Sequence, residues 1–173
     1  MNEMEALNLA LEREQGAQRF YSDAAEKTSS TEGKRMFSWL ASEEAGHSRL
    51  LEKEIAALQQ DGKWLSAEEA ESSEEMSEPI QRSELPSESE VKGEVQAQSS
   101  ELEILEEAVN SEQEAAKFYA EAARATSDPN GKAILERLTK IEEGHQLLLE
   151  EEYDWIRKSK KIFPLHRFSL PQK

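Results

Sequence analysis

The sequence has 173 residues, of which 34% are charged and 6% aromatic, and a formal net charge of −16. This length suits one domain with its own core, and the composition favours helices over sheets. The negative charge argues against nucleic acid and anionic membranes as partners, and the lack of cysteine excludes disulfides, zinc ribbons, iron–sulfur clusters and thiol catalysis.

The amino-terminal segment is acidic and helical in pattern, and it lacks the basic start and apolar core of a signal peptide. The longest run of bulky aliphatic residues is Leu147–Leu149, which is far too short to span a membrane. We therefore expect a cytoplasmic protein with no membrane segment.

Residues 3–60 are predicted to form a helical hairpin. One helical stripe has residues at steps of three and four: Leu7, Leu11, Glu14, Ala17, Tyr21 and Ala24. A second stripe follows at Phe37, Leu40, Glu44, His47, Leu51, Glu54 and Leu58. Capping-box spacing marks the helix starts at Asn2 with Glu5 and at Ser29 with Glu32. The short loop near residues 28–31 makes the two helices antiparallel.

Residues 61–100 differ from this pattern, because they contain 11 acidic residues, 3 basic residues and 9 serines. Pro79 and Pro86 interrupt the segment, so we predict a solvated connector with one short helix at Ala67–Met76. A helix of about 27 residues spans roughly 40 Å, and about 12 extended residues cross that distance. The connector is therefore long enough to return along the bundle.

Residues 101–158 are predicted to form a second hairpin, followed by a tail at 159–173. The stripe of its first helix is Leu102, Leu105, Val109, Glu112, Ala116 and Tyr119. The stripe of its second helix is Leu135, Leu138, Glu142, His145, Leu149 and Ile156. The predicted starts are a capping box at Ser100 with Glu103, and Asp128 as N-cap before Pro129.

The two hairpins are copies of one unit. When the chain is shifted by 98 positions, residues 8–58 align with 106–156 without a gap, and 20 of the 51 pairs are identical. Two such hairpins joined by one long crossover predict an all-α, ferritin-like four-helix bundle in a single domain, residues 1–173. The same crossover could let hairpins exchange between two chains, so we expect a homodimer with or without such exchange.

Four glutamates and two histidines occur at matching positions in the predicted core stripes of the two hairpins: Glu14, Glu44, His47, Glu112, Glu142 and His145. A lone buried carboxylate loses about 3–5 kcal/mol of hydration, and four together also repel one another. They must therefore protonate, pair with buried cations or coordinate metal, and the stripes offer no Lys or Arg at matching positions.

The spacing of the six residues favours metal coordination. Glu44 with His47, and Glu142 with His145, stand three residues apart and share a helix face. One Glu from each of two helices plus Glu-x-x-His from the other two is the dimetal-carboxylate arrangement. Iron and manganese both suit this ligand set. Tyr21 and Tyr119 lie two turns beyond Glu14 and Glu112, where their hydroxyls could hydrogen-bond ligand carboxylates or serve in the core alone.

The doubled segments EQGAQRFY with EQEAAKFY, and EEAGH with IEEGH, resemble the rubrerythrin-like branch of the ferritin-like superfamily. The resemblance covers roughly residues 3–60 and 101–158. It implies a non-haem di-iron oxidoreductase that reacts with hydrogen peroxide or dioxygen, as in defence against oxidative stress, with the six residues named above as ligands of two iron ions.

Two departures from the family pattern bear on the reaction. Rubrerythrins usually carry a four-cysteine rubredoxin domain, so a chain without cysteine needs an external electron donor such as a rubredoxin-like protein. They also usually have a further Glu three residues after the third-helix ligand, where this chain has Ala115. The alternatives left open are a ferroxidase or iron-binding ferritin-like protein, a di-manganese catalase-like protein, and a metal-free structural bundle.

Overall fold

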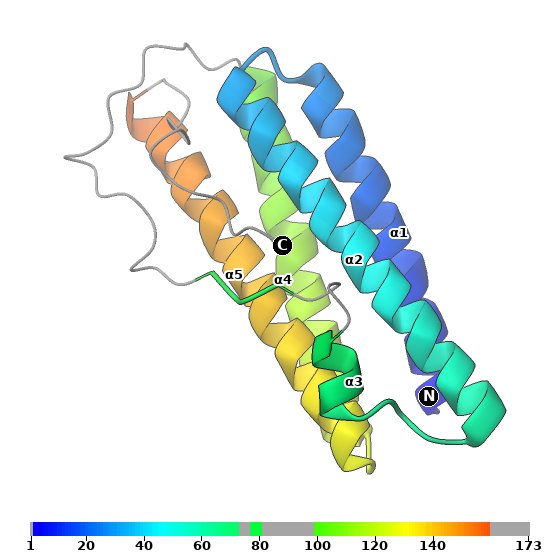
Figure 1. Cartoon of the computed structure of the whole chain (residues 1–173). Helices are drawn as coiled ribbons and strands as arrows, with labels where there is room; N and C mark the ends of the chain where they lie inside the picture. The colour runs from blue at the N-terminus through cyan, green and yellow to red at the C-terminus, as the bar shows by residue number, and fades with distance from the viewer. Residues whose placement is uncertain (1, 73–76, 81–98, 160–173) are drawn as a thin grey trace.

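The computed structural model describes residues 2–72, 77–80 and 99–159, and the regular elements in these ranges are helices. Four long helices form the bundle: α1 (Glu3–Lys27), α2 (Thr31–Asp61), α4 (Ser99–Ala125) and α5 (Pro129–Ser159). A short helix, α3 (Ala67–Ser72), follows α2 and lies beside α5 (Figure 1).

The order of the helices is that of two hairpins with a crossover. α1 pairs with α2 and α4 with α5, each through a short loop. α2 ends at the end of the bundle where the amino terminus lies, whereas α4 begins at the opposite end (Figure 1). The chain is thus an all-α ferritin-like four-helix bundle, which confirms the predicted fold class.

Helix starts were predicted with mixed success. Asn2 forms the capping box with Glu5, and the Asp128 side chain accepts hydrogen bonds at the start of α5, both as predicted. Ser29 is not the N-cap of α2, because Ser30 accepts the hydrogen bond from the Gly33 N–H group instead. Ser100 is not the N-cap of α4, which already begins at Ser99.

Apolar side chains fill both ends of the bundle. One cluster contains Tyr21 and Leu40, and the other contains their repeat counterparts Tyr119 and Leu138. All four side chains are almost fully buried. The six polar residues of the predicted stripes lie along the same helices between these clusters, so apolar layers shield them from water on both sides.

The connector is only partly the solvated segment that its composition predicted. Trp64 and Ile80 are 5% and 6% exposed and belong to the two core clusters. The predicted short helix is present as Ala67–Ser72, and residues 73–76 of that prediction lie outside the described ranges. Residues 81–98 of the connector and 160–173 of the predicted tail also lie outside them.

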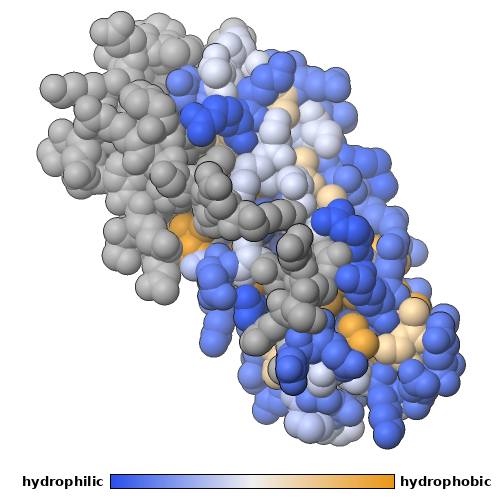
Figure 2. Space-filling view, in the orientation of Figure 1, coloured by the Kyte–Doolittle hydropathy of each residue, from blue (hydrophilic) through white to orange (hydrophobic). Residues whose placement is uncertain are grey.

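The visible face of the helices is mostly hydrophilic, with a few scattered apolar groups (Figure 2). Among the described residues, Leu9 is the one large hydrophobic side chain that is exposed. No helix in the described ranges is both long and apolar enough to cross a membrane.

Candidate metal centre

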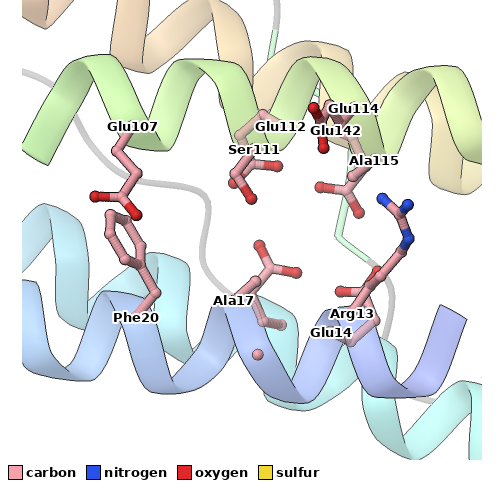
Figure 3. A pocket seen from close by; sticks show the side chains of 12 residues that line it. Arg13, Glu14, Ala17, Phe20, Glu107, Ser111, Glu112, Glu114, Ala115 and Glu142 are labelled. Carbon is pink, nitrogen blue, oxygen red and sulfur yellow. The ribbon is translucent and has the colours of Figure 1, made fainter. Parts of the chain in front are cut away.

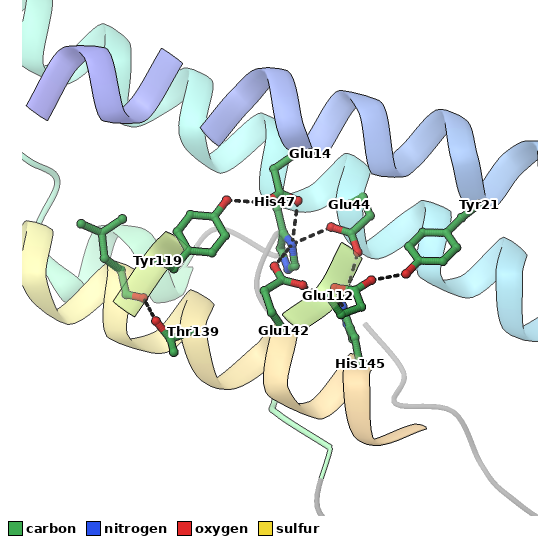
Figure 4. Close-up of polar contacts among 10 residues, drawn as sticks. Glu14, Tyr21, Glu44, His47, Glu112, Tyr119, Thr139, Glu142 and His145 are labelled. Carbon is green, nitrogen blue, oxygen red and sulfur yellow. Dashed lines mark hydrogen bonds and ion pairs between the residues drawn. The ribbon is translucent and has the colours of Figure 1, made fainter. Parts of the chain in front are cut away.

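The structure brings the six predicted polar residues together in the interior of the bundle (Figure 4). α1 supplies one glutamate and α4 another, while α2 and α5 each supply a glutamate and a histidine. Each of the six is at most 3% exposed: Glu14, Glu44, His47, Glu112, Glu142 and His145. A single chain therefore provides the complete set of side chains.

The Glu-x-x-His spacing directs each imidazole Nδ1 atom at carboxylate oxygens. His47 Nδ1 lies 3.1 Å from Glu44 Oε2 and 3.2 Å from Glu142 Oε1. His145 Nδ1 lies 3.1 Å from Glu142 Oε2 and 3.3 Å from Glu44 Oε1. Each imidazole thus faces the carboxylate of its own helix and that of the opposite hairpin.

These side chains form two overlapping groups that could each hold a metal ion. One group is Glu14, Glu44, His47 and Glu142, and the other is Glu44, Glu112, Glu142 and His145. Within each group the potential ligand atoms lie within 4.8 Å of one another. Glu44 and Glu142 belong to both groups, so the two groups share these carboxylates.

Burial and mutual repulsion shape the protonation of the outer carboxylates. Burial raises the pKa of Glu14 well above its usual value, and the nearby carboxylates of Glu44 and Glu142 raise it further. Glu112 has a raised pKa for the same reasons. Without a cation in the site, these two outer carboxyl groups therefore hold their protons to a higher pH than an exposed glutamate does.

The pKa values in the two Glu-x-x-His pairs of α2 and α5 shift the other way, toward the charged forms. Burial opposes the ionisation of Glu44, but hydrogen bonds to Glu14 and to the imidazoles hold its pKa well below its usual value. Burial alone would lower the pKa of His47, but the Glu142 carboxylate raises it well above its usual value. His145 has a raised pKa beside Glu142 and Glu44. Protons on the imidazoles therefore compensate the negative charge of the carboxylates, and bound cations could compensate it instead.

The two tyrosines bond across the hairpins. The Tyr21 hydroxyl donates to Glu112, and the Tyr119 hydroxyl donates to Glu14 (Figure 4). The sequence places each tyrosine on the helix of one glutamate, whereas the fold pairs it with the glutamate of the other unit. Burial and these carboxylates raise the pKa of both hydroxyls well above the usual value, so they remain protonated donors.

The donor atoms fit a pair of divalent ions. Glu44 Oε1 and Glu142 Oε1 are buried and accept no hydrogen bond from the described part of the chain. Each faces an imidazole Nδ1 atom, at 3.3 Å for Glu44 and 3.2 Å for Glu142, without the alignment of a hydrogen bond, and such oxygens are costly to bury unless a cation or a donor satisfies them. Four carboxylates would neutralise two divalent cations, and mixed oxygen and imidazole ligands suit iron or manganese.

A cavity of about 260 Å³ opens onto the cluster between α1 and α4. Glu14 and Glu112 form its inner wall, and Ala17 and Ala115 line it one helical turn further along (Figure 3). Arg13 lies toward one end of this view and Phe20 toward the other. This cavity gives small molecules a route to four of the six polar residues.

Sequence reasoning assigned no role to a second kind of buried carboxylate, although it placed Glu54 on a predicted core stripe. Glu54 and Glu152 are 0% and 3% exposed, although they lie outside the cluster. Both are repeat counterparts and both were retained as Glu, which is the signal that could have identified them. Glu43, 1% exposed, carries no such signal because its counterpart is Ile141.

Comparison with known proteins supports this description. The family model described as Rubrerythrin matches residues 5–153. A solved structure, a hypothetical protein Pfu-1136390-001 from Pyrococcus furiosus, is 25% identical with a TM-score of 0.67, over 91% of this chain and 92% of that chain. No curated protein matches the chain significantly.

Proposed function

The chain belongs to the rubrerythrin family, and from that premise we propose that it is a non-haem di-iron oxidoreductase acting on hydrogen peroxide or dioxygen. The observation that carries the proposal is the pair of overlapping carboxylate–imidazole groups that share Glu44 and Glu142. Two ions held by these shared carboxylates would lie close enough to act on one small substrate.

Each side chain has a distinct part in this proposal. Glu14 with His47 would hold one iron, Glu112 with His145 would hold the other, and Glu44 and Glu142 would bridge them. Bound iron would supply the electrons that cleave an oxygen–oxygen bond. The apolar clusters on both sides would keep bulk water away from the reacting atoms.

Tyr21 and Tyr119 would orient the outer carboxylates. Their hydroxyls donate to Glu112 and Glu14, which fixes the direction of the remaining carboxylate lone pairs. The same hydroxyls are the nearest protonated groups to these carboxylates, so they could also relay protons toward the substrate.

Electrons would come from another protein. The sequence has no cysteine, so it provides no four-cysteine iron site of its own. A rubredoxin-like donor remains the prediction, and so does a homodimer. Hairpin exchange is not required to complete the site, because one chain already brings all six residues together.

One observation favours a ferroxidase as a second candidate. Ala115 lines the cavity where the family resemblance leads us to expect a carboxylate. A site without this additional ligand has one fewer carboxylate that could change its coordination when the iron changes its oxidation state. A ferroxidase would oxidise ferrous iron with dioxygen and release it, and a di-manganese form would disproportionate peroxide.

Metal analysis followed by anaerobic ferrous loading tests the proposal. We expect about two irons per chain and rapid ferric absorbance on adding hydrogen peroxide. Oxidation by dioxygen alone, with iron release, would favour the ferroxidase. Oxygen evolution from peroxide by a manganese-loaded sample would favour the catalase-like activity. No bound metal after loading would remove all three and leave a structural bundle.

A further inference from the structure

The two sides of the metal centre differ in how they are covered. On the α5 side, the backbone nitrogen of Ile80 lies so close that a Cβ atom at Gly144 would come within 2.8 Å of it. Arg137 holds this part of the connector, since its guanidinium lies 3.0 Å from the Glu78 carboxylate. Trp39 stands edge-on to the His145 ring, with ring centroids 5.4 Å apart.

The α1–α4 side has no such cover among the described residues, and the cavity opens there (Figure 3). Ala17 and Ala115 each follow a proposed ligand by three residues, so they line the same faces as Glu14 and Glu112. Both stop at Cβ, and this leaves free volume directly beside the carboxylates. Substrate therefore reaches the centre between α1 and α4.

The cavity is larger than hydrogen peroxide requires. Its volume is about 260 Å³, whereas an engineered apolar cavity of about 150 Å³ is large enough to bind benzene. Ala17, Phe20 and Ala115 give it apolar surface next to the polar floor. A cavity with a polar floor and apolar walls suits a molecule with one polar end and a short apolar group.

The charges around the opening select against anions. Arg13 contributes one positive charge, whereas Glu107 and Glu114 contribute two negative charges, and all three side chains are exposed. The guanidinium also lies over the Phe118 ring, 5.0 Å from its centroid. The resulting field favours neutral or cationic molecules over carboxylates and phosphates.

We propose that the cavity between α1 and α4 admits organic hydroperoxides with a short apolar substituent. This inference rests on the proposed peroxide reaction at the same centre. The hydroperoxide group would face the carboxylate floor, and the substituent would lie over Ala17, Ala115 and Phe20.

The corresponding reaction balances with the reductant already proposed. The oxygen–oxygen bond of the hydroperoxide breaks and takes up two electrons, one from each of two ferrous ions, together with two protons. The products are one alcohol, one water and two ferric ions, which the external electron donor returns to the ferrous state.

Filling the cavity is the direct test. Ala115→Leu and, independently, Ala17→Leu should slow oxidation of the ferrous protein by tert-butyl hydroperoxide at least about tenfold more than they slow oxidation by hydrogen peroxide. Ala133→Leu, at an exposed position on α5, is the matched control and should leave both rates unchanged.

A second readout does not depend on turnover. Zinc-loaded protein with carbon-13-labelled alanine methyl groups is titrated with tert-butanol, the alcohol product. The methyl resonances of Ala17 and Ala115 should shift in a saturable way, while that of Ala133 should not.

The outcomes separate this inference from the proposed function. A ferrous protein that fails to react with hydrogen peroxide contradicts the proposed function. Reaction with hydrogen peroxide, without reaction with tert-butyl hydroperoxide and without methyl shifts, overturns only the present inference. Equal slowing of both peroxides in the Leu variants also overturns it, because the cavity would then be a general passage without a place for the substituent.

Discussion

The hydroxyl group of Tyr21 on α1 donates a hydrogen bond to the carboxylate of Glu112 on α4, in the other hairpin. The repeat reverses this relationship, because Tyr119 on α4 donates to Glu14 on α1. Each hairpin therefore orients a proposed metal ligand that the other hairpin supplies. The two copies of the unit therefore depend on each other at the buried centre.

Removing either hydroxyl should weaken metal binding. Tyr21→Phe leaves the Glu112 carboxylate without its donor, and Tyr119→Phe does the same to Glu14. Loss of such a partner typically lowers metal affinity about 10–100-fold. Competitive titration of cobalt against a chelator measures the change, and Tyr153→Phe, away from the centre, is the control. Unchanged affinity in both variants would show that the tyrosines serve only in the core.

Metal stoichiometry should distinguish a shared carboxylate from an outer one. Glu44 belongs to both ligand groups, whereas Glu112 belongs to one. Glu44→Ala should therefore remove both ions, while Glu112→Ala should retain one. Elemental analysis after ferrous loading measures the ratio of iron to protein, and Glu114→Ala, which changes an exposed residue on the same helix, should keep both ions. The same iron content in the Glu44 and Glu112 variants would contradict the bridging assignment.

Glu54 should make the protein less stable as the pH rises. Burial raises its pKa from 4.5 to about 7, with repulsion from Glu69 and Asp128 adding to this and a hydrogen bond from the Leu65 N–H group opposing it. The folded state thus binds this proton more tightly than the unfolded state, so stability falls between about pH 4.5 and pH 7.

Glu54→Gln removes this effect. The variant should exceed the wild type in free energy of unfolding by about 2–3 kcal/mol at pH 8, and the difference should vanish near pH 4. Urea unfolding at both pH values measures it, with Glu52→Gln, exposed on the same helix, as the control. A gain that is the same at pH 4 and pH 8 would show that burial of this carboxylate is not the cause.

Two glycine substitutions should have opposite effects on the metal-free protein. A Cβ atom at Gly144 would meet the backbone of Ile80 at 2.8 Å, and backbone cannot move aside cheaply. Gly144→Ala should therefore destabilise the protein by about 1–3 kcal/mol. At Gly16 the nearest group is the flexible end of Arg19, 4.0 Å away, so Gly16→Ala should stabilise the helix by up to about 1 kcal/mol.

Denaturant unfolding of both variants measures the two effects. If Gly144→Ala instead matched the gain of Gly16→Ala, the contact between the connector and α5 would not exist in solution. The connector would then not cover the α5 side of the centre.

The sequence alone determined which residues lie in the core. Helical periodicity places a residue on a face, and the apolar neighbours of Glu14, Glu44 and His47 mark that face as buried. The same pattern of glutamate and histidine on an apolar face occurs again in the second hairpin. The six-residue cluster and the bundle were therefore both predicted. Helix starts were less certain, since Ser29 and Ser30 offer the same capping chemistry one residue apart and the structure uses Ser30.

Only the tertiary structure decided which faces meet. Periodicity gives the direction of a side chain from its own helix axis, but it does not give the neighbour across the interface. The positions of the helices along the bundle axis decide that Tyr21 pairs with Glu112 across the hairpins. They also decide that two ligand groups share Glu44. The burial of Ile80 depends likewise on where the connector meets α5, because its acidic, serine-rich surroundings favour solvent.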